Sequence, residues 1–151
     1  MCMMLYIASD KKLPLVPTGL DDYQPIYVDE LSEYNSGVKK QFAKKYSYYI
    51  GSYQGCGCGF SYGQYNIDNE EVDESLIELF NTEEEKRKNS VRELFNYISN
   101  SLENVSEIEL YSCWAGNEKD TPKHRVEISL ANFFLGNKFS FEEDQLIIVH
   151  K

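Results

Sequence analysis

Residues 82–102, TEEEKRKNSVRELFNYISNSL, decide the fold. Apolar side chains recur there at steps of three and four residues, at Val91, Leu94, Phe95, Ile98 and Leu102. This spacing places them on one face of an α-helix, where they form a buried stripe. Thr82 and Glu85 have the spacing of a capping box, in which two free backbone amides are satisfied at the helix start. The stretch therefore predicts one long amphipathic helix over residues 83–103.

The opposite face of this helix is predicted to lie in solvent. Glu83 with Arg87, and Glu84 with Lys88, stand four residues apart, which is the spacing of stabilising ion pairs on a helix surface. A shorter helix is predicted just before the long one, over residues 71–80, from its own apolar periodicity.

Strands are predicted on both sides of the helix, over 2–8, 26–28, 46–54, 60–65, 107–114, 125–130 and 146–149, with a short helix over 36–45. Residues 107–114 and 125–130 alternate apolar and polar side chains, which is typical of antiparallel strands covered on one face. Residues 115–124 are predicted to join these two strands as a hairpin loop. Residues 146–149 are apolar on both faces, which predicts a central strand. The fold class is therefore α+β: a mostly antiparallel sheet with one long amphipathic helix packed on one face.

Length and charge bound the function. A chain of 151 residues fits a single domain, 1–151. It has 15 basic and 25 acidic residues and a net charge of −10. Nucleic acid and anionic membranes attract basic surfaces, so neither is expected as a partner. A small molecule or a protein remains open as the partner, and the oligomeric state stays undetermined.

The chain start and the cysteines indicate the compartment. Residues 1–8 are apolar but lack a basic leader, so we expect a first strand and no signal peptide. Four cysteines without a secretory signal predict reduced thiols and a cytoplasmic location. We expect Cys2 to be a small core residue of the first strand.

One segment suggests chemistry: Gly55-Cys56-Gly57-Cys58-Gly59-Phe60. Alternating glycines favour a sharply bent backbone, and their bare amides can hold an anion. Two thiols at this spacing lie on one face of an extended chain, where they can share a soft metal ion or form a strained disulfide. With the flanking tyrosines, the predicted ligand-binding residues are Tyr53, Gly55, Cys56, Gly57, Cys58, Gly59 and Tyr62.

A zinc ion at this segment would need further ligands, because structural zinc sites use four. The further ligands would be drawn from Cys2, Cys113 and His124, which form no second paired motif. Cys113 is predicted on the polar face of its strand, from which it can turn toward His124. The predicted metal ligands are Cys56, Cys58, Cys113 and His124, with zinc as the cofactor.

Four features carry a resemblance to known sequences: Met1-Cys2 followed by Leu5-Tyr6-Ile7-Ala8, the block at 55–60, Cys113-Trp114 before Gly116, and Pro122 before His124-Arg125. Together they resemble a family of short bacterial proteins of uncharacterised function. The resemblance runs along most of the chain, and the Gly-Cys block is its most specific part. It implies a free-standing bacterial cytoplasmic protein and supplies no activity or catalytic residue.

Three functions follow as hypotheses. The first is a small-ligand or metal-binding domain with its site at residues 55–60. The second is a thiol-dependent enzyme or redox protein that uses Cys56 or Cys58, which requires a depressed thiol pKa. The third is a protein-interaction domain without catalysis.

Overall fold

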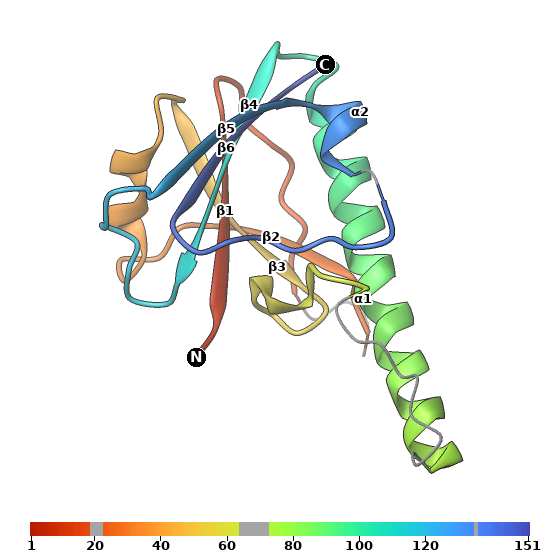
Figure 1. Cartoon of the computed structure of the whole chain (residues 1–151). Helices are drawn as coiled ribbons and strands as arrows, with labels where there is room; N and C mark the ends of the chain where they lie inside the picture. Colours follow the sequence, from red (N-terminus) through yellow and green to blue (C-terminus); the bar gives the residue numbers. More distant parts are fainter. Residues whose placement is uncertain (19–22, 64–72, 135) are drawn as a thin grey trace.

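The structure is a computed structural model, and it describes residues 1–18, 23–63, 73–134 and 136–151. In these residues six strands form one sheet in the order β2-β3-β1-β4-β6-β5 (Figure 1). The strands are β1 Met3–Ser9, β2 Ile26–Glu30, β3 Tyr46–Ser52, β4 Glu107–Trp114, β5 His124–Ser129 and β6 Gln145–His150. Neighbouring strands run antiparallel except β5 and β6, which run parallel. The helix α1 (Glu74–Ser101) lies across one face of the sheet, so the predicted fold class is confirmed.

The main core lies between α1 and the middle of the sheet. Leu94 and Ile98 of α1 are fully buried, and they belong to one cluster with Leu5 of β1 and Leu110 of β4. Burying each such side chain contributes about 1.5–3 kcal/mol relative to leaving it in water. The predicted apolar stripe is thus the contact that fixes α1 on the sheet.

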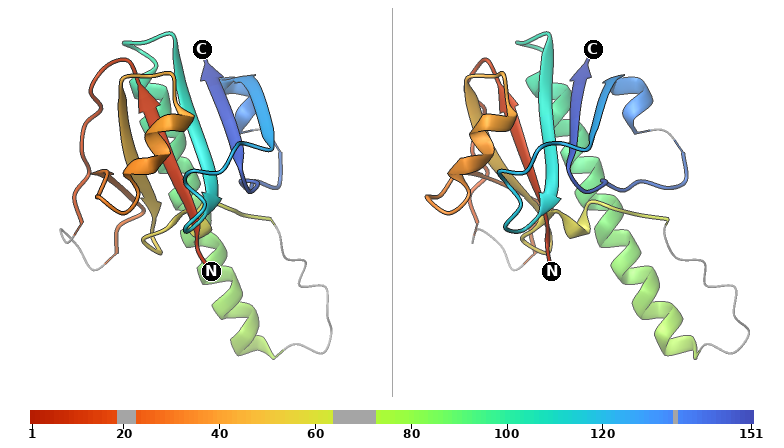
Figure 2. Two further views of the ribbon diagram at one scale, coloured as in Figure 1. Left: turned by 90° about the vertical axis from the view of Figure 1, so that its left-hand side faces the viewer. Right: turned by 60° about the vertical axis from the view of Figure 1, so that its left-hand side comes forward.

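The second face of the sheet is also covered, by the 3-10 helix η1 (Ser36–Gln41). Figure 2 shows η1 and α1 on opposite sides of the strands. Tyr6, Tyr111 and Cys113 are fully buried on this second face, in a cluster with Val38 of η1. The prediction that the polar side of residues 107–114 faces solvent is therefore wrong. The segment around η1 covers it and gives its polar groups partners, since Glu109 of β4 accepts two backbone amide hydrogen bonds, both of 3.0 Å.

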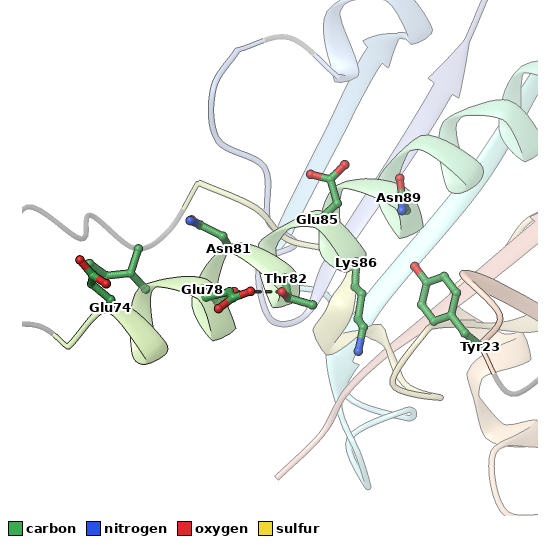
Figure 3. A pocket seen from close by; sticks show the side chains of 9 residues that line it. Tyr23, Glu74, Glu78, Asn81, Thr82, Glu85, Lys86 and Asn89 are labelled. Carbon is green, nitrogen blue, oxygen red and sulfur yellow. Dashed lines mark hydrogen bonds between the residues drawn. The ribbon is translucent and has the colours of Figure 1, made fainter.

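The helix α1 begins earlier than the capping box predicts. The carboxylate of Asp73 accepts from the amide of Ser75 at 3.2 Å and caps the helix. Thr82 lies inside the helix, where its hydroxyl donates to the carbonyl oxygen of Glu78 at 2.9 Å (Figure 3). A hydroxyl that bonds back within the helix cannot cap it. The two predicted helices are thus one, and residues 71 and 72 of the shorter prediction lie outside the described residues.

The predicted ion pairs on α1 are replaced by tertiary contacts. Glu83 accepts a hydrogen bond of 2.8 Å from the hydroxyl of Tyr53, and no ion pair joins it to Arg87 in the part of the chain described. Glu84 accepts from a backbone amide after the Gly-Cys loop at 2.6 Å and does not pair with Lys88 there. The acidic side chains of this helix face therefore hold neighbouring segments.

The predicted hairpin between residues 107–114 and 125–130 is wrong. The strand β6 lies between β4 and β5 and pairs with both. Because β6 is apolar on both faces it takes the inner position, as predicted, and the more exposed β5 becomes an edge. The predicted strand over residues 60–65 is also absent where it is described: residues 60–63 hold a single bridge, Tyr62 to Phe139, and residues 64 and 65 lie outside the described chain.

Candidate functional site

Three cysteines meet at one end of the sheet. Cys56 and Cys58 lie in the loop after β3, and Cys2 immediately precedes β1. The strands β1 and β3 pair antiparallel with Leu5 opposite Ile50, so the start of β1 lies beside the end of β3. The sulfur atoms of Cys2, Cys56 and Cys58 all lie within 4.8 Å of one another. We call these residues the three-cysteine cluster.

A buried serine organises the loop that carries two of these thiols. The hydroxyl of Ser52, the last residue of β3, donates to the carbonyl oxygen of Cys56 at 2.6 Å and accepts from the amide of Gly59 at 3.1 Å. The backbone amide of Ser52 donates to the same Cys56 oxygen at 2.9 Å. Gly55 has a φ of +84°, a conformation that non-glycine residues rarely adopt. The chain therefore turns back sharply at residues 52–56.

The 3-10 turn η2 (Gly57–Gly59) lies directly against β1. A Cβ atom at Gly57 would stand 2.9 Å from the carbonyl oxygen of Met3, so the contact requires glycine. The amide of Met3 donates to the sulfur of Cys58 at 3.1 Å. The glycines predicted to shape this loop thus allow it to dock on the strand that follows Cys2.

Burial dominates the electrostatics of the cluster. It raises the pKa of the Cys56 thiol to about 12, against the opposing effect of the Cys58 backbone amide, while the Cys58 and Cys2 thiols add to the rise. The pKa of the nearby Tyr49 hydroxyl is also raised, mainly by burial and then by the cluster thiols. A nucleophilic cysteine needs its thiolate at neutral pH. Cys56 is instead protonated there, which does not favour the thiol-enzyme hypothesis for this residue.

The other two predicted metal ligands lie outside the three-cysteine cluster. Cys113 is fully buried on β4 against the second core, and burial, followed by the charge of Glu118, raises its pKa to about 12. His124 is exposed at the start of β5, with its Nε2 atom 3.8 Å from Glu142. In the described residues, the one group of three or more donors close enough to share a metal is the cluster itself.

The two predicted ligand tyrosines have partners in neighbouring segments. Tyr53 donates to Glu83 of α1, and the Tyr62 hydroxyl donates to the carbonyl oxygen of Gly136 at 3.3 Å. Both are half-buried.

The prediction for Cys2 is wrong, because Cys2 is exposed just before β1 and belongs to the cluster. A signal for this was available in the strand pairing. A first strand antiparallel to residues 46–54 places its preceding residue next to the loop that follows residue 52.

Three thiols from two segments can hold one soft metal ion. Tetrahedral zinc with Zn–S bonds of about 2.3 Å separates its sulfur ligands by about 3.8 Å. The sulfurs of the cluster lie within 4.8 Å of one another. Side-chain rotations that shorten each sulfur–sulfur distance by at most about 1 Å would therefore bring them to the separation that zinc requires. All four cysteines of the chain are free thiols and can serve as ligands once deprotonated.

A hollow of about 560 Å³ along the first turns of α1 has different chemistry. Its wall carries Tyr23 and the carboxylates of Glu74, Glu78 and Glu85, without cysteine or histidine (Figure 3). Thiol chemistry and this hollow are therefore separate features of the molecule.

In the described residues no helix combines the length and the apolar character needed to cross a bilayer.

The chain was also compared with known proteins. The chain matches no protein-family model, no curated protein and no solved structure. The resemblance to short bacterial proteins stays a prediction.

Proposed function

We propose that this protein binds a thiophilic metal ion, zinc in the first place, through Cys2, Cys56 and Cys58. One observation carries the proposal: the three sulfur atoms, drawn from positions far apart in the sequence, lie within 4.8 Å of one another. Thiolates prefer soft and borderline ions such as Zn²⁺ and Cu⁺ over Mg²⁺ or Ca²⁺. This deepens the metal hypothesis for the Gly-Cys loop and exchanges Cys113 and His124 for Cys2.

The arrangement suits an accessible site more than a sealed one. Three protein ligands leave one position of a tetrahedral zinc ion for water or a small molecule. Cys2 is exposed, and Cys56 and Cys58 are half-buried, so an ion can enter and leave from the solvent side. The proposed role is therefore reversible metal binding in a reducing compartment such as the cytoplasm, with small molecules or proteins as partners in place of nucleic acid.

Metal binding would also join two segments of the chain. Two contacts hold the start of β1 against the loop after β3. The backbone amide of Met3 donates a hydrogen bond to the sulfur of Cys58, and Gly57 packs against the carbonyl oxygen of Met3. Because a metal ion that binds only the folded arrangement stabilises it, the metal should raise the stability of this end of the sheet.

The test is a zinc titration against a chromophoric chelator. We expect one zinc ion per chain, and a loss of affinity of at least about a hundredfold in Cys56→Ser and in Cys58→Ser, since outer partners of metal ligands alone cost 10–100-fold. Cys113→Ser is the matched control, because Cys113 is a buried thiol outside the cluster. Less than one ion per chain, or equal losses in Cys56→Ser and Cys113→Ser, would contradict the proposal.

A further inference from the structure

A hollow of about 310 Å³ lies next to the turn η2, between the end of β4, the start of β1 and α1. This volume falls at the lower end of the range for small-molecule sites. Its walls include the aromatic side chains of Phe60, Trp114 and Phe141, and its polar groups include Ser61, Arg87 and Ser140. A hollow that combines aromatic walls with a few polar groups has the composition of a ligand site.

Arg87 is the charged group of this hollow. Its Nη1 atom donates to the carbonyl oxygen of Cys58 and to the hydroxyl of Ser61, both at 2.9 Å. These two bonds hold the half-buried guanidinium in place from one side. Within the ranges of the chain that the structure describes, no carboxylate lies within 4.0 Å of Arg87, and its Nε and Nη2 atoms make no hydrogen bond.

Several other cations of the described chain have carboxylate partners. Lys44 contacts Asp10 and Glu107, and the neighbouring Lys86 contacts Glu83 at 3.5 Å. In a protein with a net charge of −10, Arg87 is held by two hydrogen bonds at the wall of a hollow, without a carboxylate within 4.0 Å among the described residues. A guanidinium presents a planar fork of donors that matches a carboxylate in two parallel hydrogen bonds.

We propose that this hollow binds a small organic monocarboxylate with an aromatic or similarly apolar body. The carboxylate would pair with the free side of the Arg87 fork, and the body would pack against Trp114 and Phe141. One arginine in an acidic protein suits a single negative charge better than a doubly charged phosphate. This site lies beside the three-cysteine cluster but does not rest on metal binding.

Trp114 gives the experiment a direct readout, because it is the one tryptophan of the chain and lies in the wall of the hollow. The probes are phenylacetate and its neutral isostere phenylacetamide, each titrated while tryptophan fluorescence is followed. We expect saturable binding of phenylacetate and binding of the amide that is at least about tenfold weaker, because a charge-assisted pair is lost. In Arg87→Gln the preference for the acid should disappear.

Arg92→Gln is the matched control. Arg92 lies on the same helix, contacts Asn89 at 3.1 Å and does not line this hollow, so its loss should leave phenylacetate binding unchanged. Equal binding of acid and amide by the unaltered protein would overturn the proposal, as would a signal that never saturates. So would unchanged acid binding in Arg87→Gln.

A second variant keeps the test decisive if Arg87→Gln does not fold. Arg87→Lys keeps the positive charge and loses the planar fork, and it should bind phenylacetate with an affinity between those of the unaltered protein and the amide complex. If it binds the acid as tightly as the unaltered protein does, the proposed fork contact is wrong. The same titration on Cys2→Ser should give unchanged phenylacetate binding. A failure of the proposed carboxylate site can therefore be distinguished from a failure of the proposed metal site.

Discussion

The three-cysteine cluster and the segment from Cys113 to His124 make an instructive pair. The segment gathers cysteine, histidine, acidic and basic side chains within a short stretch of sequence, yet Cys113 is buried in the second core and His124 is exposed on an edge strand. Cys2 and Cys56 are far apart in sequence, and their sulfurs lie within 4.8 Å. Proximity in sequence is thus a poor guide to a shared site when the residues lie on different faces of a sheet, and strand pairing is a better one.

The largest difference between the two regions should appear in thiol reactivity. Cys2 is exposed and should react with iodoacetamide at nearly the rate of a free thiol, while Cys113 should react at least about a thousandfold more slowly, because exposing it requires opening a core element. Pulsed alkylation of the metal-free protein, read by mass spectrometry, measures both rates. In denaturant the two rates should become equal. Comparable rates in the native protein would remove the distinction between the regions.

The pH dependence of the same experiment sharpens the comparison within the cluster. The pKa of Cys56 is raised to about 12, above the working range. Its thiolate fraction, and with it the alkylation rate, should rise about tenfold for each pH unit between 7 and 9. A rate for Cys56 that levels off in this range would show a much lower pKa and would reopen its use as a nucleophile.

The next effect is on stability. Cys113→Ser places a hydroxyl in a fully buried apolar position and should lower the free energy of unfolding by about 1–3 kcal/mol. Cys2→Ser changes an exposed side chain and should alter it by less than about 0.5 kcal/mol. Urea unfolding of the metal-free variants compares them. A larger loss of unfolding free energy in Cys2→Ser than in Cys113→Ser would contradict the burial of Cys113 and the exposure of Cys2.

The smallest effect concerns the backbone that positions the thiols. In Gly57→Ala the added Cβ would stand 2.9 Å from the Met3 carbonyl oxygen, so η2 must shift on β1 and weaken zinc binding by up to about tenfold. Gly136→Ala, between β5 and β6, is the control. Its φ of +104° also favours glycine, but no atom lies within 4 Å of the added Cβ and Gly136 does not belong to the cluster. Zinc affinity that falls equally in both variants would point to a general loss of stability.

Most of the fold follows from patterns in the sequence. The stripe from Val91 to Leu102, the strand at residues 107–114 and the central strand at 146–149 are all found near their predicted positions. Local periodicity suffices there because one buried face specifies each element. The hairpin prediction failed because it assumed that neighbours in sequence pair, and the more apolar β6 took the position beside β4.

The candidate site was half predictable. The Gly-Cys loop was identified from its composition, and Ser52 and Gly57 give that prediction a structural reason. Cys2 was missed because a cysteine in an apolar stretch is usually a core residue. Arg87 was missed as well, because nothing in the run Lys86-Arg87-Lys88 indicates which of its three side chains lies in the wall of a hollow.

The sequence by itself determined that this is an acidic α+β protein with one long amphipathic helix, because charge and apolar periodicity are local properties. Only the tertiary structure decided which thiols meet and which cation lies in the wall of the hollow beside η2. Both depend on strand order and register, which bring β1, β3 and the turn η2 together at one end of the sheet. Those contacts join residues that no local pattern connects, and the three-cysteine cluster is the clearest example.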